Sequence, residues 1–184
     1  MGNFESSWWQ HFVPECFFDT VLLKKLLQTN NRLMHRKGCN NVANDLKSDR
    51  LKNLFAVAII DKDKKELDYL KECEIKYDAN KLLLLKHKTE KHYIIQLNPP
   101  LENWVVEILD ENNLAIENFG YPRSFKKLKK EIKSDIDNEN DVKLNALVNA
   151  IVKTDCETIK KMRSFLHHLK DKNYEADINT LING

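Results

Sequence analysis

The first eighty positions alternate between short apolar runs and stretches with helical spacing. Positions 55–60 are six consecutive apolar residues, including two isoleucines and a valine. An unbroken run of this kind is typical of a strand buried on both faces, as in a parallel sheet. Further strands are predicted around 12–13 and at 33–36, with helices over 17–33, 42–48 and 65–74. Strand followed by helix, three times over, indicates an α/β fold.

The pattern changes in the second half of the chain. Apolar runs at 81–87 and 92–97 are joined by four polar residues, which predicts a hairpin or an edge pair of strands. Helical spacing then appears at 101–109, 124–134, 141–154 and 157–172. We therefore predict an α/β domain over 8–113, with a mainly parallel sheet flanked by helices. A C-terminal helical extension over 124–184 is predicted to pack on it.

Acidic residues follow two of the predicted strands. Glu15 closes the first, and Asp61 and Asp63 directly follow the buried run at 55–60. Right-handed crossovers bring the carboxyl ends of parallel strands to one edge, where open α/β sheets bind ligands. Glu15, the Gly/Asn turn at 37–41 and the two aspartates are therefore expected to lie together. Such carboxylates suit a hard divalent cation, although they could equally cap the helices that follow them.

Charge is informative only in its distribution. The net charge of +2 does not indicate a nucleic-acid-binding protein, but lysines are concentrated at 126–133 and again at 153–163. Such clusters could follow a phosphate backbone, or could form a solvated helix face. No stretch approaches 18 apolar residues and no secretion signal is recognisable, so neither secretion nor a membrane span is expected.

The four cysteines are scattered along the chain without a Cys-x-x-Cys pair. This spacing predicts neither a zinc knuckle nor a disulfide framework, and it favours a cytoplasmic location. No Walker A or Gly-x-Ser-x-Gly motif is present, and the histidines do not pair at a metal-ligand spacing. Because the chain has only four glycines, a phosphate-cradling loop is not expected.

In order and spacing, the strand-end motifs resemble the Toprim (topoisomerase-primase) fold. The segment 15–19, Glu-Cys-Phe-Phe-Asp, is similar to the Glu-Gly-x-x-Glu motif of Toprim-like nucleases in overcoming-lysogenisation-defect and related phage-defence proteins. The turn at 37–42 and the segment 100–104 resemble two further motifs of such proteins, and the resemblance covers about residues 8–110. Cys16 stands where these proteins have glycine, which raises the question of turn geometry and activity.

The resemblance implies a nuclease that hydrolyses phosphodiester bonds in DNA or RNA with Mg²⁺ or Mn²⁺, as part of a phage-defence system. It implies catalytic roles for Glu15, Asp61 and Asp63. The implied metal ligands are Glu15, Asp19, Asp61, Asp63 and Glu102. Lysines that could contact nucleic-acid phosphates are Lys37, Lys62, Lys64, Lys126, Lys127 and Lys130. A partner ATPase or another defence subunit is implied as well, and a homodimer is compatible with the sequence.

Two other functions remain open. In the first, the chain is a non-catalytic Toprim-like module whose acids cap helices and whose surface binds a partner ATPase or toxin. In the second, it is a nucleic-acid-binding regulator that uses the lysine-rich helix at 126–133.

Overall fold

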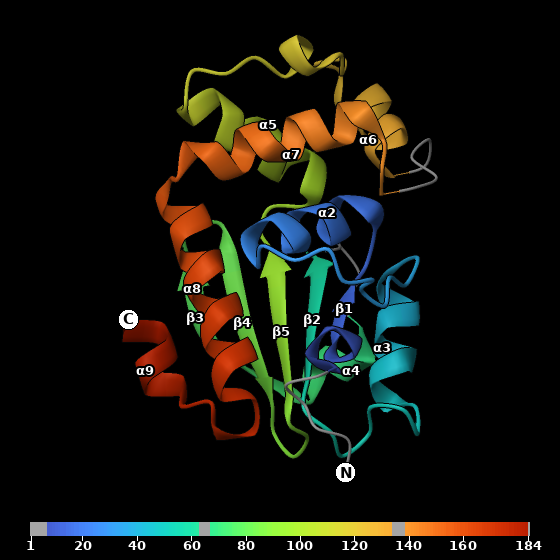
Figure 1. The fold of residues 1–184 in the computed structure, drawn as a ribbon, viewed down its shortest axis with the longest axis vertical. Helices are drawn as coiled ribbons and strands as arrows, with labels where there is room; N and C mark the ends of the chain where they lie inside the picture. Colours follow the sequence, from blue (N-terminus) through green and yellow to red (C-terminus); the bar gives the residue numbers. More distant parts are fainter. Residues whose placement is uncertain (1–6, 63–66, 134–138, 184) are drawn as a thin grey trace.

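A five-stranded mixed sheet forms the centre of the chain, in the order β1-β2-β5-β4-β3 (Figure 1). The structure, a computed structural model, describes residues 7–62, 67–133 and 139–183. The strands are β1 (Phe12–Pro14), β2 (Ala56–Asp61), β3 (Cys73–Ala79), β4 (Leu82–His87) and β5 (His92–Leu97). β1, β2 and β5 are parallel, whereas β4 and β3 complete the sheet in antiparallel order. The α/β prediction is therefore confirmed at the level of class, with a sheet that is mixed.

β2 is buried on both faces, as its apolar run predicts. Val57 and Ile59 belong to the larger hydrophobic core, and Ala58 and Ile60 belong to the smaller core on the opposite side of the sheet. This alternation follows from the strand geometry, in which successive side chains point to opposite faces.

Helices cover both faces of the sheet. The larger core receives side chains from α2 (Phe17–Leu26), α5 (Leu101–Glu111), α6 (Phe125–Lys133), α7 (Val142–Thr154), α8 (Glu157–Lys172) and α9 (Ile178–Asn183). The smaller core receives them from α3 (Cys39–Lys47) and α4 (Asp68–Lys71). Three short 3-10 helices complete the described elements: η1 (Trp8–His11), η2 (Ile116–Phe119) and η3 (Asn173–Glu175).

The helices predicted over 101–109, 124–134, 141–154 and 157–172 are confirmed as α5, α6, α7 and α8. Trp104 of α5 and Phe165 of α8 lie in the same hydrophobic core. The C-terminal helices thus share their core with the sheet. None of the helices in the described ranges combines the length and the apolar character that a membrane span requires.

Two local predictions are wrong, and one strand is not predicted. The segment 33–36 is not a strand: it gives β1 one hydrogen bond, from the Arg36 N–H to the Pro14 carbonyl (2.9 Å), before the chain turns at Gly38. The helix predicted over 65–74 is only the single turn of α4, with residues 65 and 66 outside the described ranges. The unpredicted β3 follows it as an edge strand, although residues 73–79 alternate between apolar and polar side chains, which is the pattern of a half-buried strand.

Candidate active site at the carboxyl edge of the sheet

Glu15 lies at the carboxyl end of β1 and links three segments of the chain. Its backbone N–H donates to the Ile59 carbonyl at 3.0 Å, which extends the pairing of β1 with β2 by one residue. Its carboxylate Oε2 accepts hydrogen bonds from the Asp61 N–H at 3.0 Å and from the Cys39 thiol at 2.8 Å. The side chain is buried, so the carboxylate is held in one position by partners from β2 and α3.

Asp61 is the last residue of β2, and only 2% of its surface is exposed. Its carbonyl accepts a hydrogen bond from the Gln96 side-chain amide at 3.2 Å, so the neighbouring strand β5 also fixes this strand end. In Figure 1 the carboxyl ends of β2 and β5 point toward α2 and α5. The expected meeting of Glu15, Asp61 and the turn at 37–41 is confirmed.

Gly38 gives that turn its shape. Its φ of 91° and ψ of 147° lie in a backbone region that residues with a Cβ atom rarely adopt. Its N–H donates to the Glu15 carbonyl at 3.3 Å, and the next residue, Cys39, begins α3 with its thiol directed at Glu15. Glycine at position 38 therefore allows the backbone conformation that brings the Cys39 thiol to the Glu15 carboxylate.

Cys16 does not disturb the turn where related motifs have glycine. Its φ of −141° and ψ of 176° are extended, so no glycine is required. Its N–H (3.2 Å) and its thiol (3.1 Å) both donate to Asp19 Oδ2, which lies in the first turn of α2. Burial raises the pKa of the Cys16 thiol well above its usual range, and the nearby charges of Asp19 and Asp61 raise it further. The thiol therefore remains a protonated donor.

Glu102 lies in the first turn of α5, just beyond β5, and is buried. Its Oε1 is 3.5 Å from the Lys129 ammonium of α6. No recorded hydrogen bond joins it to Glu15 or Asp61 within the ranges that the structure describes. Glu102 thus shares the sheet edge with the other acids but has a cationic partner of its own.

The predicted phosphate-contacting lysines fall into two groups. Lys37 and Lys62 are exposed beside the strand ends, and Lys126, Lys127 and Lys130 are exposed on α6. Asp63 and Lys64 lie outside the described residues.

Four acidic residues are buried among those that the structure describes, and all four are predicted metal ligands: Glu15, Asp19, Asp61 and Glu102. Removing carboxylates from water costs several kcal/mol per ion unless a cation or hydrogen-bond donors compensate. Their oxygen atoms are the donor type that Mg²⁺ and Mn²⁺ prefer. In the described ranges, however, no three His, Cys, Asp or Glu side chains are already arranged to hold a metal ion. The donor chemistry fits such a cation, and the ligands would have to converge further around it.

Sequence reasoning missed the two neutral groups that hold this edge together, Cys39 and Gln96. Cys39 was visible only as part of the turn motif, because a thiol at the start of a helix carries no spacing signal. Gln96 interrupts the apolar run at 92–97 one residue before its end, and a polar residue at that position is the one signal that could have identified it. Comparisons of this chain with protein-family models, with curated proteins and with solved structures gave no match.

Proposed function

We propose that this chain is a Toprim-like nuclease that hydrolyses phosphodiester bonds in DNA or RNA with Mg²⁺ or Mn²⁺, as part of a phage-defence system. The observation that supports the proposal most is the burial of Glu15, Asp19, Asp61 and Glu102 at one edge of the sheet. A purely structural role does not require four ionisable side chains in a place where each is costly to desolvate.

The chain's own residues have separable roles in this proposal. Glu15 and Asp61, joined by the hydrogen bond between the Asp61 N–H and Glu15 Oε2, are the main cation ligands. The two hydrogen bonds that the Glu15 carboxylate accepts from described residues are both accepted by Oε2, so Oε1 is the oxygen offered to a cation. A bound cation would neutralise charge that develops on the attacking and leaving oxygens of the phosphodiester. Asp63, next to this pair in the sequence, is proposed as a third ligand.

Cleavage assays test the proposal directly. Plasmid, single-stranded DNA and tRNA are incubated with the protein in Mg²⁺ or Mn²⁺, beside Glu15→Gln, Asp61→Asn and the exposed control Glu74→Gln. The two edge variants keep the size and one acceptor oxygen of each side chain, so we expect them to fold and to lose about 100-fold or more of the activity. Glu74→Gln should cleave like the wild type. No cleavage of any substrate, or equal cleavage by all variants, would contradict a nuclease.

The exposed lysines of α6 are proposed to hold the phosphate backbone of the substrate. Lys126, Lys127 and Lys130 lie on the helix whose Lys129 reaches Glu102, so this face adjoins the acidic edge. Changing one of these lysines to Ala should weaken nucleic-acid binding and reduce its salt dependence by about one released counterion. Binding to short DNA and RNA at several salt concentrations measures this, with Lys76→Ala, a half-buried lysine on the distant edge strand, as the control.

One specific observation favours the non-catalytic alternative. Glu15 Oε2 and Asp19 Oδ2 each accept two hydrogen bonds from the chain itself, so both carboxylates contribute to the local structure without a cation. In that case the chain would be a Toprim-like module that binds a partner ATPase or toxin. The two functions differ in a simple measurement: a module of this kind is neither stabilised nor activated by Mg²⁺ or Mn²⁺.

A further inference from the structure

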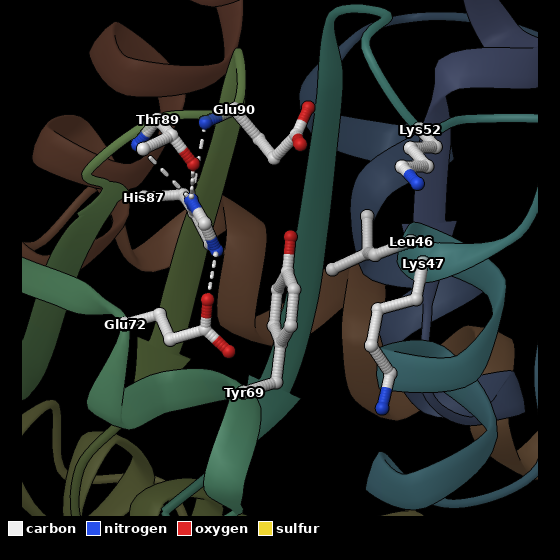
Figure 2. Close-up of a pocket in the computed structure, with 8 residues that line it drawn as sticks. All are labelled: Leu46, Lys47, Lys52, Tyr69, Glu72, His87, Thr89 and Glu90. Carbon is white, nitrogen blue, oxygen red and sulfur yellow. Dashed lines mark hydrogen bonds and ion pairs between the residues drawn. The ribbon is translucent and has the colours of Figure 1, made fainter.

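A polar pocket lies at the edge of the sheet opposite the buried acids, where β4 ends and β5 begins. Its volume is about 250 Å³. It opens between the end of α3 with the loop behind it, on one side, and α4, β3 and the β4–β5 turn on the other (Figure 2). The lining residues are Leu46, Lys47, Lys52, Tyr69, Glu72, His87, Thr89 and Glu90.

His87 is held in a single protonation form at the pocket wall. Its Nδ1 accepts hydrogen bonds from the backbone N–H groups of Thr89 (3.3 Å) and Glu90 (3.1 Å). Nδ1 therefore carries no proton, and the proton of the neutral ring is on Nε2. Nε2 lies 3.6 Å from the Glu72 carboxylate. A dashed line marks this pair in Figure 2. Because this nitrogen is protonated, His87 is a hydrogen-bond donor toward the pocket and not a metal ligand.

Tyr69 forms the rigid floor between the two sides. Its ring packs on that of His87, with centroids 4.9 Å apart. Its hydroxyl is hydrogen-bonded to Nδ1 of the buried His92, whose Nε2 donates to the Leu51 carbonyl at 3.1 Å. With the Nε2 proton committed to that carbonyl, Nδ1 is the acceptor and the tyrosine is the donor. The floor is therefore pre-organised before any ligand binds.

Opposite charges stand on the two sides of this floor. Figure 2 shows Glu72 and Glu90 on the side of His87, and Lys47 and Lys52 across Tyr69 from them. The Glu90 carboxylate is fixed by the Asn53 N–H at 2.9 Å. Neither lysine has a recorded ion pair within the described ranges, so both ammonium groups remain available to a ligand. The two carboxylates would repel a polyanion such as nucleic acid, and the two lysines would repel a simple cation.

We propose that this pocket binds a small zwitterion of the size of a free amino acid. The ammonium group of the ligand would lie against Glu72 and Glu90, and its carboxylate would lie toward Lys47 and Lys52. The volume is below the range that accommodates drug-sized ligands, which suits a molecule of this size. The site is independent of the acidic edge and would supply the protein with a sensor for a metabolite.

Calorimetric titration with the free L-amino acids, one at a time, tests the proposal. We expect at least one of them to bind. Its amide, which lacks the carboxylate, and its N-acetyl derivative, which lacks the ammonium, should each bind at least about tenfold more weakly. The variants Glu72→Gln and Lys52→Met should weaken binding by a similar factor. The matched controls Glu74→Gln and Lys76→Met, on the edge strand outside the pocket, should bind like the wild type.

Three results would overturn the proposal. The first is the absence of binding by every amino acid. The second is binding that Glu72→Gln and Lys52→Met leave unchanged. The third is equally tight binding of inorganic phosphate that depends on Lys52 but not on Glu72, because that would identify an anion site. None of these measurements uses nuclease activity, so they stand apart from the test of the acidic edge.

Discussion

The parallel strands β1, β2 and β5 end at one side of the sheet, the carboxyl edge, and begin at the opposite side, the amino edge. These two sides bury polar groups in opposite ways. The carboxyl edge buries four acids, of which Glu15 and Asp61 are directly linked. The amino edge buries His87 and His92, and burial lowers the pKa of both rings so that they remain neutral. Tyr69 completes a hydrogen-bond chain there that ends at a backbone carbonyl.

This difference predicts different responses to substitution at the two edges. A neutral buried network in which each polar group has a partner makes the structure rigid and stable. Buried carboxylates at adjacent strand ends are costly for stability, and a cation that binds between them would offset that cost. We therefore expect changes at the amino edge to lower the free energy of unfolding. Charge-removing changes at the carboxyl edge should mainly abolish the response to cations.

The largest expected effect on stability is that of His92→Leu. This change leaves the Tyr69 hydroxyl and the Leu51 carbonyl without their buried partner, and each such loss costs about 1–3 kcal/mol. Urea denaturation should show a loss of about 3 kcal/mol. Tyr69→Phe removes a single donor and should cost only about 1 kcal/mol. Equal losses in the two variants would contradict the chain of hydrogen bonds.

The carboxyl edge should respond to divalent cations instead. At a Mg²⁺ or Mn²⁺ concentration about 100 times the dissociation constant, the wild type should gain about 2.7 kcal/mol in unfolding free energy. Glu15→Gln keeps an oxygen that accepts from Asp61 and Cys39, so without cation it should be as stable as the wild type. When the cation is added, the unfolding free energy of this variant should not increase. Thermal unfolding with and without Mn²⁺ measures both statements, and equal stabilisation of the variant would exclude Glu15 as a ligand.

The neutral histidines predict a pH dependence of stability. Their folded pKa values are below the usual value of about 6.5, so below that pH the unfolded chain takes up protons that the folded chain excludes. Stability is complete above this pH and falls as the pH decreases toward the folded pKa, by up to about 1.4 kcal/mol per pH unit for each histidine. His87→Asn offers an oxygen to the same two N–H groups. It should lower the number of protons taken up on unfolding by about one, so the unfolding free energy should change less steeply with pH. Denaturation between about pH 5 and 7.5 measures the two slopes, and identical slopes would count against a neutral His87.

The smallest expected effects concern two backbone positions next to Glu15: Gly38, whose N–H donates to the Glu15 carbonyl, and Cys16, the following residue. Gly38→Ala should cost about 1 kcal/mol, because φ there is 91° but the space for a methyl group is open. Cys16→Gly should also destabilise, by about 1 kcal/mol, since the backbone at position 16 is extended and the thiol donates to Asp19. A Cys16→Gly variant more stable than the wild type in urea would show that cysteine strains this turn.

Part of this arrangement could be predicted from the sequence. The apolar run before Asp61 predicts a strand buried on both faces, and β2 is such a strand. The helical spacing over 101–172 predicts α5 to α8 within one or two residues. The convergence of Glu15 and Asp61 follows from the common edge at which parallel strands end, whereas the Gly38 turn reaches that edge although the segment before it is not a strand.

Other features depend on contacts between segments far apart in the chain. The segment 33–36 has a strand's composition, yet it forms only one hydrogen bond to β1 before Gly38 turns the chain away. The positions of Cys39 and Gln96 at the carboxyl edge, and the pairing of His92 with Tyr69 at the amino edge, depend on such contacts as well.

The sequence by itself therefore determined which residues are apolar, where four of the five strands and most of the longer helices lie, and that acids stand at two strand ends. Only the tertiary structure decided which neutral groups hold those acids and which histidines are locked in one protonation form. The physical reason is that periodicity is a local property of the chain, whereas burial and hydrogen-bond partners are set by residues dozens of positions away.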